Sequence, residues 1–302
     1  MTTGRGASFA IVTGVYAVAL GAGVAAGALA GTGSPLATAA FADLVATVVV
    51  FLASRACDNS SMYDLYWSAV PPAIATWFLA VAEPGVPAWR QALVVTLVWA
   101  WAVRLTANWA RGWPGLTHED WRYAMARDNG RPYWLQSFFG FHLFPTIQVY
   151  LGCLALVPAL ARGGAGPGVL DVAALLVTGG AIVLETVADQ QMRAFARTKA
   201  PGDIMDRGVW AWSRHPNYLG ELGFWWGLFL FGVAADPAAW WWTLSGPLAM
   251  TCMFLFASIP LLDGRSVERR PGYAEYMQRV PALLPFPRRV RPGSSEGAAA
   301  DT

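Results

Sequence analysis

The residues best suited to chemistry form one run of nine, Ser213-Arg214-His215-Pro216-Asn217-Tyr218-Leu219-Gly220-Glu221. This run brings guanidinium, imidazole, amide, phenol and carboxyl groups to the start of an apolar stretch, 222–235. Charged and amide groups at a membrane boundary are costly unless they bind a ligand or one another. Proline suits the first turn of a helix, where its missing N–H costs little. The run therefore predicts a polar binding element that opens a membrane helix.

Polar side chains also enter the ends of other apolar stretches. Ionisable residues inside membrane segments are costly and often mark binding sites. All of these residues fall at the ends that we expect to face the cytoplasm, which predicts a single polar cavity open to the cytosol. They are Asp64, Arg104, Asn108, Glu185, Asp189, Arg193, Asp263 and Arg265.

Structural roles are the alternative for several of these residues. Glu185, Asp189 and Arg193 are spaced by four, so they share one helix face, and a salt bridge accounts for the lower pair. Arg104 is long enough to extend to the membrane interface. His142, alone inside its apolar stretch, is better explained by structural hydrogen bonds than by ligand binding.

The composition is that of an integral membrane protein. Hydrophobic residues make up 56% of the chain and charged residues 13%, whereas soluble domains carry about 25% charged residues. Apolar stretches of about 20 residues can cross a bilayer. We therefore predict an all-α polytopic transmembrane helical bundle with seven to eight spans, whose cytoplasmic loops form a cofactor site. The stretches are 8–31, 37–54, 64–82, 89–109, 137–161, 169–188, 219–235 and 239–261, and a re-entrant segment would reduce the count to seven.

Charge placement predicts the orientation. All 21 Lys and Arg residues except Arg90 and Arg162 fall at the termini or in alternate loops. The positive-inside rule then places both termini in the cytoplasm, and in a bacterium the protein would lie in the inner membrane. Asp43 and Asp171 fall near the opposite ends of their stretches, where we expect them at the membrane interface.

The rest of the sequence limits the other possibilities. We predict one membrane domain, 1–290, followed by a disordered Gly/Ser/Ala-rich tail, 291–302. A net charge of +2 gives no nucleic-acid footprint, and three histidines without an HExxH motif give no metal site. Gly21-Ala22-Gly23 lies inside a membrane stretch, so it is a packing motif and not a dinucleotide fingerprint.

Several motifs together resemble the steroid 5α-reductase family, and most closely its bacterial branch, DUF1295. They are the nine-residue run, Glu185-x3-Asp189-Gln190, Gly208-Val209-Trp210, Arg104-Leu105-Thr106, Glu119-Asp120-Trp121-Arg122-Tyr123, and the ending Arg269-Arg270-Pro271-Gly272-Tyr273-x2-Tyr276 to Pro281 and Pro285. The resemblance covers about 64–288.

This resemblance implies a membrane-embedded reductase that uses NADPH to reduce a carbon–carbon double bond, most simply that of an enone, in a steroid-like or other lipid. It assigns Asn217 and Glu221 to the nicotinamide and its ribose. It places a catalytic carboxylate at Asp64, and Tyr66 and Tyr123 are candidates for the catalytic tyrosine. The implied catalytic set is Asp64, Tyr123 and Glu185. The implied cofactor-binding set is Asp189, Arg193, Arg214, His215, Asn217, Tyr218, Glu221, Arg265, Arg269 and Tyr273.

Two other functions stay open. An isoprenylcysteine methyltransferase-like enzyme would use a similar His-Pro-x-Tyr-x-Gly element to bind S-adenosylmethionine. The loop 119–123, the position of Asp64 and the number of preceding stretches favour the reductase instead. A non-enzymatic lipid-binding membrane protein or transporter is the other alternative, although the sequence shows no repeated half with broken helices.

The predicted orientation can be tested by cysteine labelling on intact cells. Cysteines introduced in 119–123, in 203–214 and at the C-terminus should stay unlabelled, because these segments are expected inside the cell. A cysteine beside Gly164 should react. Labelling of all four positions from outside would overturn the orientation.

Overall fold

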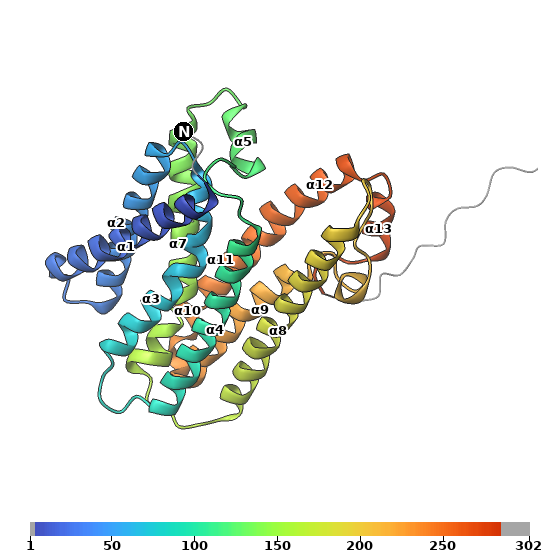
Figure 1. Cartoon of the computed structure of the whole chain (residues 1–302). Helices are drawn as coiled ribbons and strands as arrows, with labels where there is room; N and C mark the ends of the chain where they lie inside the picture. Colours follow the sequence, from blue (N-terminus) through green and yellow to red (C-terminus); the bar gives the residue numbers. More distant parts are fainter. Residues whose placement is uncertain (1–3, 285–302) are drawn as a thin grey trace, which may run out of the picture.

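The computed structural model describes residues 4–284, and these form helices without any strand (Figure 1). Seven helices are long and apolar enough to cross a membrane, which confirms the predicted all-α polytopic bundle. Five are single elements: α1 (Arg5–Ala30), α2 (Pro35–Ala56), α4 (Ala88–Gly112), α8 (Val169–Thr198) and α9 (Pro216–Ala235). The predicted tail, 291–302, lies outside the described residues, as does Pro285.

The other two long helices are composite. The first, Tyr133–Arg162, joins α6 (Tyr133–Gln136), η2 (Ser137–Leu143), α7 (Phe144–Cys153) and η3 (Val157–Arg162). The second, Pro237–Arg269, joins η5 (Pro237–Ala239), α10 (Trp240–Thr243), α11 (Ser245–Met253), η6 (Phe254–Ser258) and α12 (Ile259–Arg269). The segments η2, η3 and η6 are wider π-helical turns, which insert a residue into the regular helix.

The remaining predicted stretch, 64–82, forms a shorter helix that still passes through the bundle. It consists of η1 (Ser60–Leu65) and the 15-residue α3 (Tyr66–Ala80). At one end Asp64 accepts a hydrogen bond from Tyr123, in the loop after α4. At the other end the Glu83 N–H donates to the Ala161 carbonyl, at the end of η3. Together η1 and α3 therefore connect the same two ends of the bundle as α4.

Short connecting helices gather at one end of the bundle. They are α5 (Trp121–Arg127), η4 (Gly208–Ala211) and α13 (Tyr273–Arg279), and Figure 1 shows α5 and α13 beyond the ends of the long helices. This is the end at which the sequence places the polar residues, so these connections surround the candidate site.

Small residues let α8 and α9 approach closely. A Cβ atom at Gly220 would lie 2.7 Å from the Glu185 Cβ atom, and one at Gly227 would lie 2.0 Å from the Thr178 Oγ1 atom. Trp101 of α4 stacks on Phe224 of α9, with ring centroids 4.3 Å apart. These contacts fix the relative positions of the three helices that carry most of the polar site residues.

Asp43 and Asp171, in the opposite half of the bundle, were expected at the membrane interface. This prediction was wrong, because both side chains are buried inside the protein. Asp171 accepts a 2.8 Å hydrogen bond from the buried Arg90, which joins α8 to α4. Asp43 accepts a 2.6 Å hydrogen bond from Tyr66. Helix pairing could not be inferred from the sequence, and it is the pairing that gives each carboxyl group a buried donor. His142 is hydrogen-bonded as expected, through Ser54 and the Ser137 carbonyl.

The close approach of α8 and α9 makes a stability prediction. Gly227→Ala should destabilise the protein by about 1–3 kcal/mol, because its methyl group would overlap Thr178. Gly179→Ala on α8 is the matched control, because nothing lies within 4 Å of its Cβ position. Thermal midpoints in detergent should fall for the first variant only, and equal midpoints would contradict this packing.

Candidate functional site

The start of α9 is organised around one buried carboxylate, Asp263 of α12. Asp263 accepts hydrogen bonds from Arg214 at 2.7 Å, His215 at 3.0 Å and Tyr273 at 2.9 Å. Arg214 also donates to the Val280 carbonyl, after α13. The charged groups of the nine-residue run are therefore paired with groups from α12 and α13, which removes the cost of burying them.

A cavity of about 180 Å³ lies beside this cluster, between α8, α9, α12 and α13. Its lining is aromatic and cationic, which suits a planar ring and an anionic group. The polar and aromatic lining residues are Phe195, Lys199, Trp210, Arg214, His215, Asn217, Tyr218, Ser266, Arg270, Tyr273 and Tyr276. Burial raises the pKa of Tyr273 to about 12, so this phenol keeps its proton at neutral pH and donates to Asp263.

Three polar side chains in the lining, those of Lys199, Asn217 and Tyr218, form no hydrogen bond or ion pair within residues 4–284, and the buried Nε of Arg214 also lacks a partner. Lys199 is exposed and Asn217 is half-buried, so both are open to water or a ligand. The cavity thus presents donors for an anionic or amide-bearing molecule.

A second cluster joins α4 to α8 below the cavity. Arg104 contacts Glu185 at 2.6 Å and Asp189 at 2.9 Å, while Arg193 donates to Asn108 one turn further along. Arg104 therefore pairs with two carboxyl groups of α8 and does not extend to the membrane interface. One buried oxygen of Glu185, Oε2, has no hydrogen-bond partner.

Glu221, the last residue of the nine-residue run, is buried among tryptophans. Its two oxygens accept hydrogen bonds from Trp101 at 3.1 Å and Trp225 at 2.9 Å. Both oxygens are thereby occupied by indole donors, and the residue is only 9% exposed. In this arrangement Glu221 supports the floor of the site, whereas Asn217, one turn earlier, lines the cavity.

The third cluster pairs Asp64 with Tyr123. The Tyr123 hydroxyl donates to Asp64 Oδ1 at 2.5 Å, and Arg122 lies 3.8 Å from the same oxygen. Burial raises the pKa of Asp64 to about 6, although the Arg122 charge acts in the opposite direction. Burial and the neighbouring carboxylate raise the pKa of Tyr123 well above its usual value. The pair therefore holds protons close to neutral pH, as an acid group must.

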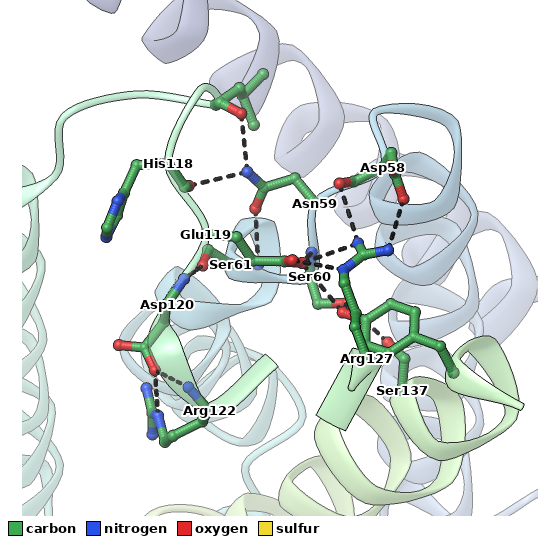
Figure 2. A network of polar contacts seen from close by, with 12 residues as sticks. Asp58, Asn59, Ser60, Ser61, His118, Glu119, Asp120, Arg122, Arg127 and Ser137 are labelled. Carbon is green, nitrogen blue, oxygen red and sulfur yellow. Dashed lines mark hydrogen bonds and ion pairs between the residues drawn. The ribbon is translucent and has the colours of Figure 1, made fainter. Parts of the chain in front are cut away.

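The loop that carries Tyr123 is fixed to η1 by a polar network (Figure 2). Glu119 accepts hydrogen bonds from the Ser60 N–H at 2.7 Å and from Arg127 at 2.7 Å. Arg127 also contacts Asp58 at 2.9 Å. These contacts hold the pKa of Glu119 below its usual value, despite partial burial. Because Asp64 belongs to η1 and Tyr123 to α5, the network sets the distance between them.

The predicted site residues thus occupy three neighbouring clusters. Five of the predicted cofactor-binding residues line the cavity, namely Arg214, His215, Asn217, Tyr218 and Tyr273. Asp189 and Arg193 lie on the α4–α8 contact together with Glu185, and Glu221 lies beneath the cavity. Arg269 is not among the cavity-lining residues. Arg265 lies 4.0 Å from the ring centre of Trp121, so it joins α12 to α5.

Sequence reasoning missed Lys199 and Arg270 in the cavity lining, as well as the role of Asp263. Asp263 carried a signal, because an acidic residue inside a membrane stretch requires a partner. The other two are ordinary loop and helix-end cations in the sequence, and only the fold places them at the cavity. Within residues 4–284, no three His, Cys, Asp or Glu side chains are placed to hold a metal ion.

Comparisons with known proteins identify the family of the chain and one relative. The family described as "Protein of unknown function (DUF1295)", a steroid 5α-reductase-like family, matches residues 50–280, and the chain belongs to it. An uncharacterized protein of Schizosaccharomyces pombe, C594.04c, is 28% identical over 252 residues, which are 75% of this chain and 73% of that protein. No solved structure matches the chain.

The raised pKa of Asp64 predicts a pH-dependent stability. The folded protein binds this proton more tightly than the unfolded chain, whose carboxyl group titrates near 3.8. The corresponding stability is complete below pH 3.8 and is lost as the pH rises through about 6. Asp64→Asn does not titrate, so its thermal midpoint should rise relative to wild type between pH 5 and pH 7. Asp128→Asn, an exposed position on the same loop, is the control, and a constant difference for Asp64→Asn would contradict the shift.

Proposed function

We propose that the protein is an NADPH-dependent reductase of a carbon–carbon double bond in a membrane lipid. The observation that carries this proposal is the cavity at the start of α9, with the unpaired Lys199 and Asn217 in its lining. Two of its cations, Lys199 and Arg270, suit the phosphates of a dinucleotide, and the Asn217 amide suits the carboxamide of a nicotinamide. In the proposed orientation, with both termini in the cytoplasm, the cavity opens to the compartment that contains NADPH.

The residues of the lining fit one end of the cofactor by their donor chemistry, because about 180 Å³ is less than the roughly 300–1,000 Å³ of a complete small-molecule site. Bound there, NADPH would supply a hydride for the substrate double bond. Arg214, His215 and Tyr273 are fixed on Asp263, so they present a rigid wall to the cavity. Glu221 and its two tryptophans lie outside the cavity lining, and their hydrogen bonds join α4 to α9 one turn beyond Asn217.

We assign the proton side of the reaction to Asp64 and Tyr123. The hydroxyl of Tyr123 shares a 2.5 Å hydrogen bond with Asp64, and the two residues lie on elements different from those of the cavity. When Asp64 is protonated, its carboxyl O–H can donate to the phenol oxygen, and the Tyr123 O–H is then free to donate to the carbonyl oxygen of an enone. The substrate class that suits this placement is a lipid with a polar carbonyl end and an apolar body.

Ligand-induced stabilisation of purified protein tests the cofactor. NADPH at 100 times its dissociation constant should stabilise the protein by about 2.7 kcal/mol, while S-adenosylmethionine should have no effect. Asn217→Ala should weaken NADPH binding about fivefold, the equivalent of one hydrogen bond of about 1 kcal/mol. Arg197 is an exposed arginine of α8, the helix that forms one side of the cavity, so the Arg197→Gln variant should bind NADPH as wild type does. Stabilisation by S-adenosylmethionine alone would instead support a methyltransferase.

Substitution of Asp64 tests the proton side separately. Asp64→Asn keeps the size of the side chain but loses its acidity, and acid assistance is worth about 10² to 10⁴ in rate. Turnover should fall by that factor while the NADPH dissociation constant stays nearly unchanged, because Asp64 does not line the cavity. Normal turnover in the folded variant would remove Asp64 from the catalytic set.

A further inference from the structure

A second hollow, of about 730 Å³, lies between α4 and α8 on the outside of the bundle. Its apolar part is formed by Trp99, Ala100 and Val103 of α4, all exposed within a helix long enough to span a membrane. Its polar part is formed by Arg104 and Arg111 of α4 and by Thr186 and Gln190 of α8, while Thr96 lies among the apolar residues. We call this hollow the α4–α8 groove.

The length of the groove matches one lipid. Its lining extends along α4 from Val95 to Arg111, which is about 24 Å at 1.5 Å per residue. One leaflet with its headgroup layer is about 21 Å deep, half of the total bilayer thickness. The apolar part of the groove therefore lies at the depth of acyl chains, and the polar part lies at the depth of headgroups.

The charge at the polar end favours an anion. Arg104 is already compensated by Glu185 and Asp189. The guanidinium of Arg111, by contrast, forms no ion pair within residues 4–284.

Two further guanidinium groups near the same helix end bind neutral partners. Arg5 donates to the carbonyls of Ala110 and Arg111, and Arg193 donates to Asn108. Near a membrane surface each such cation attracts an anionic lipid by about 1 kcal/mol.

From this combination of depth, length and charge we propose that the α4–α8 groove binds one anionic phospholipid of the surrounding bilayer. The acyl chains pack against Trp99, Ala100 and Val103, and the phosphate lies beside Arg111, with the Gln190 amide as a hydrogen-bond donor. The Thr186 hydroxyl already donates to the Ile182 carbonyl. This site is separate from the cofactor cavity, which shares none of its lining residues. It does not depend on the proposed reductase activity.

Native mass spectrometry of the purified full chain tests the proposal, with phosphatidylglycerol as the probe and phosphatidylcholine as the zwitterionic comparison. Wild type should bind one phosphatidylglycerol in preference to phosphatidylcholine. Arg111→Gln should weaken that binding about fivefold, the factor that corresponds to about 1 kcal/mol. Arg55→Gln is the matched control, because Arg55 is an exposed arginine in the last turn of another long helix, α2.

A second pair of variants tests the apolar part of the groove. Ala100→Phe should fill it and reduce the binding of phosphatidylglycerol, whereas Ala92→Phe, on an exposed part of α4 outside the groove, should not. Equal binding of the two lipids, or equal losses in Arg111→Gln and Arg55→Gln, would overturn the proposal. Binding of glycerol 1-phosphate as tight as that of the lipid would also overturn it, because the site would then recognise a soluble phosphate.

Discussion

The candidate site depends on the pairing of buried charges at the start of α9. Arg214 and His215 are each only 5% exposed, and a buried guanidinium without a partner would cost several kcal/mol. Asp263 removes this cost and, in doing so, ties the first turn of α9 to α12 and, through Tyr273, to α13. The Asp263 carboxylate thus holds α9, α12 and α13 together around the cavity. Lys199 and Asn217 line the same cavity and have no side-chain partner.

The sequence was sufficient for the helical class and for the end of the bundle at which the polar residues gather. Both follow from local properties, namely long apolar stretches and the positions of ionisable residues within them. Partners were harder to infer, because Asp263 and Arg214 are 49 residues apart and meet only through helix packing. For the same reason the burial of Asp43 beside Tyr66 was missed. The partners of buried polar side chains are thus predicted less well than the positions of the helices to which these side chains belong.

The two halves of the candidate chemistry come from different parts of the chain and are joined by a contact between α12 and α5. Asp64 and Tyr123 belong to η1 and α5, whereas the cavity is built by α8, α9, α12 and α13. Arg265 of α12 lies over the ring of Trp121, the first residue of α5. This cation–π contact joins the two halves at the end of the bundle where both are accessible. A group at the cavity that attracts Arg265 would therefore also affect the position of the loop that carries Tyr123.

The contacts between α4 and α8 have a mechanical consequence. The two helices are joined by Arg90 and Asp171 near one end and by Arg104 with Glu185 and Asp189 near the other. These ionic contacts are 14 residues apart along α4, or about 21 Å. Helices that are fixed at two such points and separated by a groove can bow apart between them without breaking either contact. The elasticity of the helices, and not the strength of the ion pairs, would then limit how far this face of the protein opens.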